Sequence, residues 1–441
     1  MNPFERVLIA GTGPAAIQLA VTMNQQGSCA VALAGRESAG SSILFAALAE
    51  SRGTVRAETQ NESHRRMQGE CRLDRVYPRY ADIDEPWDVL VLAVTTDAYC
   101  EVLEQMDSSV LRQLRCVILV SPTFGSGSLV SHYMRNRGHD QVEIISFSTY
   151  FGDTRWKEGT PSFQVLTAGI KKKVYIGSTA PASPNVARLT GLFSRLGIQL
   201  QNAGTPLAAE TRNISLYVHP PLFMNDVALE AVFHASAPRR YVYKLFPEGP
   251  ITMRLIEEML DYWKEIMDIT ERLSLPKLNL LACMNEDSYP VRPESLARED
   301  IERFTELEPI HQQYLLYVRY ASLLIDPFSD PDPEGKYFDF SAVPIRQTYV
   351  NKEGKLDIPR MPKEDYYRIK IIRGMARRLG AASPVMDRLI ARYESALERA
   401  AAIHAPFPLS RAFAACSFDD HVDMIYSDPM IRKNDGSAQS I

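Results

Sequence analysis

The sharpest chemical signal in the sequence is a glycine motif near its beginning. Gly11, Gly13 and Ala16 form a GxGxxA pattern directly after the apolar run 6–10, at the start of a helical stretch that reaches about residue 26. Such glycines permit a tight turn and let a pyrophosphate approach the backbone, while the helix amides face the phosphates. The motif predicts a dinucleotide site, against the alternative of a glycine-rich turn without a ligand. The expected contacts are Gly11, Thr12, Gly13, Pro14 and Ala15.

The end of the second apolar run distinguishes between dinucleotides. NAD and FAD sites usually present an Asp or Glu there, which binds the ribose hydroxyls. This sequence instead has Arg36, with Ser38 close behind it. Because a guanidinium pairs with a 2′-phosphate in a bidentate manner, we predict NADPH/NADP+ as the cofactor, bound by Arg36 and Ser38. Glu37 counts against this choice, and the alternative is that Arg36 lies in a solvated loop.

Two further loops follow apolar runs, at 93–98 and 121–126. Ligands of doubly wound sheets bind where the carboxyl ends of strands meet, so these loops are expected to close over the cofactor. The predicted contacts to ribose or nicotinamide are Thr95, Pro122 and Thr123. Ordinary turn formation and capping are the alternative role for these residues.

Among eight histidines, His219 stands out for chemistry. It lies just beyond the expected domain joint and is followed by two prolines, which we expect to end regular structure and let the imidazole project. Imidazole is the side chain best suited to exchange protons near neutral pH. The alternative is a histidine with a purely structural role. No histidine or cysteine pair has metal-ligand spacing, so we predict no metal site.

The elements that must position these residues change character along the chain. The first third alternates five apolar runs, at 6–10, 29–34, 88–93, 115–120 and 142–147, with helix-length amphipathic stretches. This alternation is typical of βαβ units on a parallel sheet. We expect 162–167 and 173–177 to extend the sheet as a hairpin. A helix at 183–196 and a strand at 198–200 are expected to complete this half.

The second half has helical periodicity in the windows 251–273, 298–325, 364–380 and 383–403. The turn-rich passage 202–206 suits a domain boundary. We therefore predict an α/β protein with an N-terminal Rossmann-type doubly wound sheet at 1–205. A mostly α-helical C-terminal domain follows at 206–441, with a flexible tail from about residue 433.

Composition places limits on the partners. The 441 residues are 45% hydrophobic and 23% charged, with a formal net charge of −5, as in a folded globular protein and unlike most nucleic-acid binders. The apolar runs are too short to span a membrane, and the first ten residues do not resemble a secretion signal. Six scattered cysteines fit reduced thiols. We expect a cytoplasmic protein with neither nucleic acid nor membrane as partner.

Five segments make the chain resemble the opine dehydrogenases, namely GTGPAAIQLA, AGRES, SPTFGS, STYFGDTR and NISLYVHPPLFMND. The similarity is to the branch that makes nicotianamine-like metallophores, the staphylopine, pseudopaline and yersinopine dehydrogenases, and it covers nearly the whole chain. The resemblance implies an NADPH-dependent reductive condensation of an amine-bearing metallophore precursor with a 2-oxo acid, pyruvate or 2-oxoglutarate, through an imine. It also implies a homodimer.

The resemblance further implies roles for particular residues. His219 matches the position of the family's catalytic histidine, which a distant carboxylate orients, and Asp326 is our candidate for that carboxylate. Asp153 is a candidate for binding a substrate ammonium group and Arg155 for pairing with a carboxylate, with Tyr150 beside them. Surface ion pairing is the alternative for Asp153 and Arg155.

Two other functions are compatible with this layout. One is a ketopantoate-reductase-like NADP-dependent dehydrogenase acting on an alcohol or ketone, although such an enzyme usually offers a lysine base, and we identify none. The other is a non-catalytic NADP(H)-binding sensor, for which substitution of His219 would have no effect on function.

Overall fold

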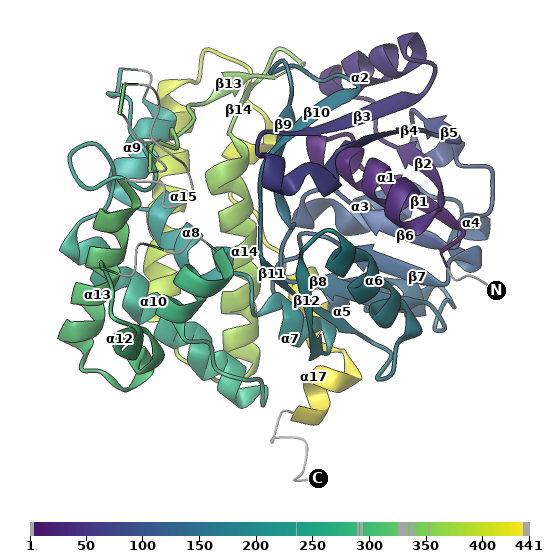
Figure 1. The fold of residues 1–441 in the computed structure, drawn as a ribbon. Coiled ribbons are helices and arrows are strands. Elements are labelled where there is room, and N and C mark those ends of the chain that lie inside the picture. Colours follow the sequence, from purple (N-terminus) through teal and green to yellow (C-terminus); the bar gives the residue numbers. More distant parts are fainter. Residues whose placement is uncertain are drawn as a thin grey trace. The chain divides into compact units, whose positions relative to one another are not determined.

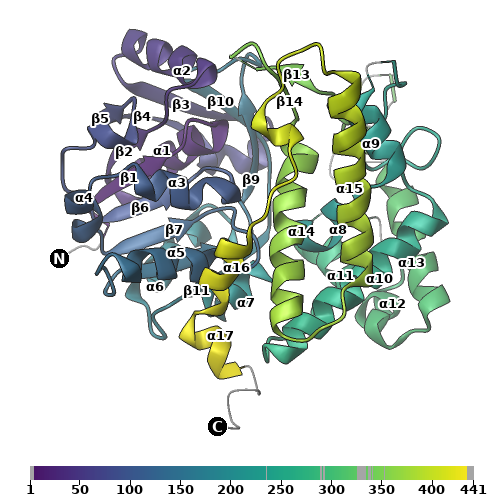
Figure 2. The ribbon, with the colours of Figure 1, turned by 180° about the vertical axis from the view of Figure 1, so that it is seen from behind.

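A computed structural model of the chain describes residues 4–234, 236–288, 291, 294–324, 334–335, 339, 341–351 and 353–434. The chain divides into two compact units, residues 1–212 and 213–441. Figure 1 shows both units, and Figure 2 shows them from behind. No helix in the described part of the chain is both long and apolar enough to cross a bilayer.

The first unit is built on an eight-stranded sheet with the order β12-β11-β8-β7-β6-β1-β2-β5. The six strands from β8 to β5 are parallel, and β11 pairs with β8 in the antiparallel direction. The strands are β1 (Arg6–Ala10), β2 (Ala30–Ala34), β5 (Arg75–Tyr77), β6 (Val89–Leu92), β7 (Cys116–Leu119), β8 (Glu143–Phe147), β11 (Lys173–Ser178) and β12 (Gln199–Gly204). The chain leaves β1 toward β2 on one side and returns to β6 on the other, so the order reverses beside β1.

A second sheet of four strands, in the order β4-β3-β10-β9, belongs to the same unit. Its strands are β3 (Thr54–Thr59), β4 (Gly69–Arg72), β9 (Gly152–Trp156) and β10 (Gln164–Ile170). Helix α1 (Pro14–Gly27) packs against strands of both sheets, and its residues 16–23 are all buried. A helix that is buried on every side must be apolar or internally satisfied. The buried Gln18 meets this requirement by accepting a bond from the Thr167 hydroxyl at 2.7 Å.

The predicted hairpin between residues 162–167 and 173–177 is wrong. β10 pairs with β3 and β9 in the second sheet, whereas β11 joins the main sheet beside β8 and β12. The reason is burial: Val165 and Thr167 of β10 are fully buried and face the side of α1 that the main sheet does not cover. The other five predicted strands, the helix at 183–196 and the strand near 198–200 are all present.

The remaining helices of the first unit connect these strands. They are α2 (Ala39–Glu50), α3 (Tyr99–Glu104), α4 (Ser108–Gln113), α5 (Ser126–Asn136), α6 (Pro184–Arg195) and α7 (Pro206–Glu210). Helix α7 belongs to this unit, because the fully buried Glu210 at its end accepts the Gly127 amide of α5 at 2.7 Å.

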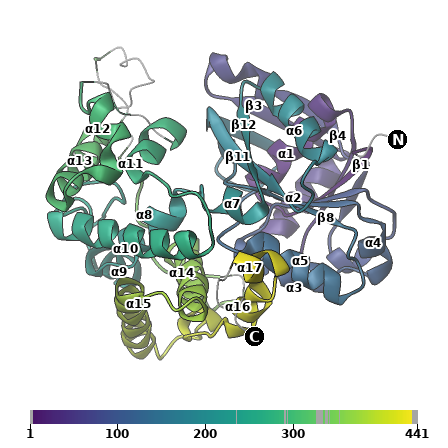
Figure 3. The same ribbon diagram turned by 90° about the horizontal axis from the view of Figure 1, so that it is seen from below.

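The second unit is helical, as predicted. Its elements are α8 (Ser215–Phe223), α9 (Asp226–Phe233), α10 (Met253–Arg272), α11 (Leu280–Ala282), α12 (Arg298–Glu302), α13 (Pro309–Ala321), α14 (Arg360–Arg378), α15 (Pro384–Ile403), α16 (Asp419–Tyr426) and α17 (Pro429–Asn434), with a short ribbon of β13 (Tyr349–Val350) and β14 (Leu356–Asp357). Helices α10, α14 and α15 pack on one another, and α8 packs against both α10 and α14 (Figure 3). The tail beyond α17 lies outside the described residues.

Candidate functional site

The glycine motif forms a turn between β1 and α1 at the carboxyl edge of the parallel sheet. Gly11 has a φ of +144°, and a Cβ there would lie 2.4 Å from the carbonyl oxygen of Ala93, the residue after β6. The Gly11 amide donates to Ala34 O at 2.8 Å, and the Ala93 amide donates to Ala10 O at 2.8 Å. The turn is therefore held close to the ends of β2 and β6, and only glycine fits at position 11.

The start of α1 has the properties of a phosphate site. Gly13 is its N-cap, and neither a side-chain cap nor an acidic first turn neutralises the helix terminus. A Cβ at Gly13 would meet no protein atom within 4 Å, and Thr12, Gly13, Pro14 and Ala15 are partly exposed above a buried core. The amides of a first helical turn lack helical acceptors, so this open cradle fits a pyrophosphate.

Arg36 lies directly after β2 at the same edge. Its side chain is 61% exposed, and its Nη1 lies 3.8 Å from Glu101 Oε1, a separation at which an exposed pair contributes little. Burial raises the pKa of the neighbouring Tyr80 to about 12, an effect that Arg36 opposes, so Tyr80 is a neutral hydroxyl. The hydrogen bond to Asp82 raises the pKa of Arg79, and the negative charge of Glu37 adds a smaller contribution in the same direction. Because Arg36 is exposed and only weakly paired with Glu101, its guanidinium can accommodate a 2′-phosphate.

Ser38 is the N-cap of α2, where its hydroxyl accepts the Ser41 amide at 3.0 Å. Thr95 is half-buried after β6, whereas Pro122 and Thr123 are buried after β7. The Thr123 amide donates to Ser126 Oγ at 3.0 Å. Among the described residues the Thr123 hydroxyl has no hydrogen-bond partner. The structure thus brings Arg36, Thr95 and Thr123 to one edge of the sheet, and their contact with a cofactor remains a prediction.

The candidate substrate residues of the first unit follow β8. The Tyr150 hydroxyl bonds to Thr154 Oγ1 at 2.8 Å, and burial raises the pKa of Tyr150. Asp153 and Arg155 are exposed on β9, where the Arg155 guanidinium donates to Gln60 Oε1 at 3.1 Å. Their roles toward a substrate remain predictions.

His219 lies within α8, and the expectation that the two prolines end the helix is wrong. Pro220 and Pro221 are inside α8, which continues to Phe223. Packing against α10 and α14 outweighs the helix-breaking tendency of proline, and the fully buried Leu216 and Leu222 contribute to that packing. The imidazole is 20% exposed and lies edge-on to Phe223, with ring centroids 5.4 Å apart.

The carboxylate that faces His219 is Asp365 of α14. Its Oδ1 lies 3.6 Å from His219 Nδ1, and its side chain is fully buried. Asp365 is 146 positions away in the sequence, and no local motif marks it, so sequence reasoning missed it. The predicted partner, Asp326, lies outside the described residues. A buried carboxylate beside an imidazole can orient the ring and stabilise its protonated form.

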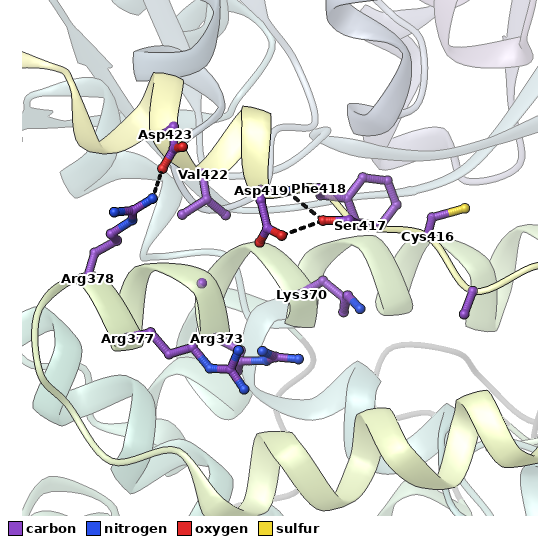
Figure 4. A pocket seen from close by; sticks show the side chains of 12 residues that line it. Lys370, Arg373, Arg377, Arg378, Cys416, Ser417, Phe418, Asp419, Val422 and Asp423 are labelled. Atoms are coloured by element: carbon purple, nitrogen blue, oxygen red, sulfur yellow. Dashed lines mark hydrogen bonds and ion pairs between the residues drawn. The ribbon is translucent and has the colours of Figure 1, made fainter.

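A separate cavity of about 610 Å³ lies between α14 and the segment 415–423 (Figure 4). Four cations line it, and each has a carboxylate partner. Lys370 pairs with Glu394 at 3.0 Å, Arg373 and Arg377 both approach Asp387 at 3.4 and 3.5 Å, and Arg378 pairs with Asp423. Because each of these cations already lies beside a carboxylate of the chain, we assign no ligand to this cavity.

Comparison with solved structures gives the class of protein first. The chain superposes on yersinopine dehydrogenase with NADP+ bound at a TM-score of 0.90, with 30% identity and coverage of 98% of this chain and 100% of the other. It superposes on octopine dehydrogenase at 0.60, with 15% identity and 98% coverage of both chains. The fold is that of the opine dehydrogenases, which confirms the predicted fold class.

Sequence comparison then gives the family. The profile of the staphylopine dehydrogenase family matches residues 5–429. Staphylopine synthase of Staphylococcus aureus is 45% identical over 416 residues, covering 94% of this chain and 96% of the relative. Pseudopaline synthase of Pseudomonas aeruginosa is 35% identical, covering 89% and 90%. The chain belongs to the staphylopine dehydrogenase family, and the resemblance to the metallophore branch of opine dehydrogenases is confirmed.

Proposed function

We propose that this enzyme is an NADPH-dependent opine dehydrogenase that joins the amine of a nicotianamine-like, histidine-derived metallophore precursor to a 2-oxo acid. The single observation that carries the proposal is family membership at 45% identity over nearly the full length of both chains. The open cradle at Gly13, the exposed Arg36 and the His219–Asp365 pair supply the chemical groups that such a reaction needs.

The cradle binds NADPH through the backbone at residues 11–15, with Arg36 at the 2′-phosphate. A relative with NADP+ bound has the same fold, and no acidic residue occupies the position after β2 that an NAD site uses. When bound, the cofactor supplies hydride to the imine carbon. Ser38, Thr95, Pro122 and Thr123 surround the remainder of the dinucleotide.

His219 is the acid–base group of the second unit. The amine attacks the keto carbon of the 2-oxo acid to give a carbinolamine, and His219 removes a proton from nitrogen and returns one to the departing hydroxyl. Water leaves, an imine forms, and hydride with a proton completes the secondary amine. Asp365 holds the imidazole and stabilises its charged form in the part of the cycle where it carries the extra proton. Tyr150, Asp153 and Arg155 bind the amine-bearing substrate.

The proposal extends to the setting of the enzyme. We infer a homodimer in the cytoplasm, with the first 205 residues as the cofactor domain and residues 206–441 as the substrate domain. All six cysteines are free thiols, which fits a reducing compartment. Light scattering coupled to size-exclusion chromatography measures the oligomeric state, and a monomer at micromolar concentration would contradict the dimer.

A coupled substrate screen tests the reaction. The enzyme is mixed with NADPH, a nicotianamine-type amine, and either pyruvate or 2-oxoglutarate, while the absorbance of NADPH is followed. We expect oxidation that requires both substrates, and a product mass equal to amine plus 2-oxo acid minus one oxygen atom. Oxidation with a 2-oxo acid alone would favour a ketone reductase. No oxidation with any pair would overturn the proposal.

A further inference from the structure

A cluster of buried charges on α14 lies behind His219. Arg368 lies one helical turn after both Glu364 and Asp365, because residues three and four positions apart are neighbours on a helix surface. Glu364 and Arg368 are each 4% exposed, and Asp365 is fully buried. Two carboxylates and one guanidinium therefore lie together out of solvent, where an uncompensated charge is strongly unfavourable.

Arg368 is the buried cation that compensates both carboxylates. Its Nη1 donates to Asp365 Oδ1, and its Nη2 donates to Glu364 Oε1 at 3.3 Å. The other oxygen of Glu364 accepts from Nε of Arg360, whose side chain is 61% exposed. The contacts therefore run from the exposed Arg360 through Glu364 and Arg368 to Asp365, the carboxylate beside the imidazole.

Two buried atoms on either side of the pair lack partners. His219 Nδ1 and Asp365 Oδ2 have no hydrogen-bond partner within the described part of the chain, and Nδ1 lies 3.6 Å from the other oxygen, Oδ1. Buried polar groups are almost always hydrogen-bonded. A rotation of the carboxylate that brought Oδ2 to Nδ1 would satisfy both atoms and leave Oδ1 with Arg368.

We propose that Arg368 is a positioning residue for the reaction, acting through Asp365. By holding Oδ1 it leaves Oδ2 to accept a hydrogen bond from His219 Nδ1–H. The imidazole is then fixed in the Nδ1–H tautomer, and Nε2 is the atom that exchanges protons with substrate. This inference rests on the proposed function for its catalytic meaning and on the side-chain contacts for its geometry.

The other polar groups near the pair do not replace Arg368. Tyr262 and Glu265 of α10, Tyr217 of α8 and Tyr393 of α15 face the same region. Burial raises the pKa of Tyr262 and of Tyr393, so both are neutral hydroxyls. Glu265 is engaged with the start of α15, where it accepts the amides of Val385 and Met386 at 2.6 and 3.1 Å.

The structure also defines the arrangement that competes with this proposal. Arg368 Nε is buried and has no hydrogen-bond partner among the described residues. If the guanidinium turned so that Nε and Nη2, the two donors on one edge, formed a fork with both oxygens of Asp365, the carboxylate would be fixed in the plane of the guanidinium and Oδ2 would not turn toward His219. The imidazole would then be free to adopt the Nε2–H tautomer, so the tautomer of His219 discriminates between the two arrangements.

Nitrogen chemical shifts of the full-length protein provide that measurement. Protein labelled with ¹⁵N-histidine is examined at a pH where the imidazole is neutral, and His219→Gln assigns the signal. We expect the Nδ1–H tautomer in the wild type and a mixture of tautomers in Arg368→Met. The Nε2–H form in the wild type, or an unchanged signal in Arg368→Met, would overturn the proposal.

Arg392 of α15 offers a matched control. It forms a two-pronged ion pair with Glu258 of α10 at 3.0 Å for both contacts, it is 20% exposed, and it makes no contact with Asp365. Arg392→Met removes an ion pair between helices without changing the His219 tautomer. If Arg392→Met alters the tautomer as much as Arg368→Met does, the effect is general loosening of the unit and the proposal fails.

Steady-state kinetics give the second readout. Arg368→Met is expected to lower kcat about 10- to 100-fold, by analogy with the partners that orient metal-bound side chains, with the KM for NADPH unchanged. Arg368→Lys keeps the charge and recovers part of kcat. If Arg368→Met does not fold, Glu364→Gln combined with Arg368→Met removes one charge of each sign and serves in its place. A loss confined to KM, or no recovery with lysine, contradicts the positioning role.

The two readouts separate this inference from the proposed function. The tautomer measurement needs no turnover. A wild-type enzyme that is inactive with every amine and 2-oxo acid would contradict the proposed function, and the geometry around Arg368 could still be tested. An active enzyme whose His219 tautomer does not depend on Arg368 would contradict only the positioning role of Arg368 and would leave the proposed function intact.

Discussion

His219 is held by a helix that its own sequence disfavours. Pro220 and Pro221 have no amide hydrogen, so they donate no helical hydrogen bond to the carbonyls of Leu216 and Tyr217, at a cost of about 3 kcal/mol for an interior proline. The buried contacts of α8 with α10 and α14 offset this cost. The imidazole therefore occupies a rigid position opposite Asp365, as an acid–base group requires.

The first prediction concerns the imidazole itself. His219→Ala removes the proton-transfer group, and we expect kcat to fall about 10²- to 10⁴-fold, since general acid–base groups contribute on that order. Binding of NADPH, measured by fluorescence titration, is expected to be unchanged because the cradle belongs to the other unit. Wild-type turnover in His219→Ala would favour a different catalytic group, and an inactive wild type that binds NADPH would favour the sensor.

The second prediction concerns the selection of the dinucleotide. Arg36→Ala removes a charge-assisted contact worth about 1.5–3 kcal/mol, so the Kd for NADPH should rise about 10- to 100-fold while that for NADH changes little. Arg56→Ala is the matched control, because Arg56 is a similarly exposed arginine of the same unit, paired with Glu70 at 2.7 Å. Equal weakening of NADPH and NADH by Arg36→Ala would contradict a 2′-phosphate site.

The turn between β1 and α1 illustrates how an element serves two purposes. Gly11 is needed for the fold, because its φ of +144° and its 2.4 Å approach to Ala93 O exclude a side chain. Gly13 has open space around its Cα and no such conformational need. We therefore expect substitutions at the two glycines of this motif to separate effects on stability from effects on ligand binding.

The third prediction follows from this difference. Gly13→Ala should leave the melting temperature of the ligand-free protein unchanged and weaken NADPH binding at least tenfold, because a methyl group would fill the space that the pyrophosphate needs. Gly11→Ala should destabilise the protein itself by about 1–3 kcal/mol through backbone strain. Thermal denaturation with and without NADPH distinguishes the effect of Gly13→Ala on binding from the effect of Gly11→Ala on stability. Unaltered NADPH binding by Gly13→Ala would show that the cradle is not the cofactor site.

Whether a strand could be predicted from the sequence depended on how much of it is buried. Five of the six parallel strands, β1, β2, β6, β7 and β8, are apolar on both faces and could be located from sequence, whereas the three-residue edge strand β5 was not. The second sheet was not predicted from the sequence, because its edge strands β4 and β9 are short and have exposed polar side chains such as Asp153 and Arg155. The glycine turn after β1 has a local motif, whereas the pairing of His219 with Asp365 exists only after helices distant in sequence pack together.

The fourth prediction compares two glycines inside helices. A Cβ at Gly374 of α14 would lie 2.4 Å from Val422 Cγ2 of α16, whereas a Cβ at Gly191 of α6 would meet nothing within 4 Å. We expect Gly374→Ala to destabilise by about 1–3 kcal/mol through overpacking. Gly191→Ala should stabilise by about 0.5–1 kcal/mol, because alanine is the better helix former. Urea denaturation measures both, and stabilisation by Gly374→Ala would contradict close packing of α16 on α14.

At the scale of the whole molecule, the two units divide the chemistry between them. The first contains the open cradle at residues 11–15, where we propose that the dinucleotide binds, and the second contains His219, Asp365 and the buried Arg368. Each unit has its own buried core. The limit of the cofactor domain, predicted at residue 205, remains to be tested against the division of the chain after Arg212.

The fifth prediction tests that limit with two fragments. Fragment 1–212 retains α7, whose buried Glu210 accepts hydrogen bonds from the Gly127 amide and the Ser146 hydroxyl, both at 2.7 Å. Fragment 1–205 leaves these buried donors without their carboxylate, and a lost bond to a charged group costs about 1.5–3 kcal/mol.

We therefore expect fragment 1–212 to unfold cooperatively and to bind NADPH, with a melting temperature that rises with NADPH concentration, because a ligand that binds only the folded state stabilises it. Fragment 1–205 should melt at a clearly lower temperature. Equal stability of the two fragments would place α7 outside the cofactor unit. Both fragments contain residues 11–15 and Arg36. If fragment 1–212 is stable but its melting temperature does not rise with NADPH, these residues are not sufficient, and the second unit must contribute to the cofactor site.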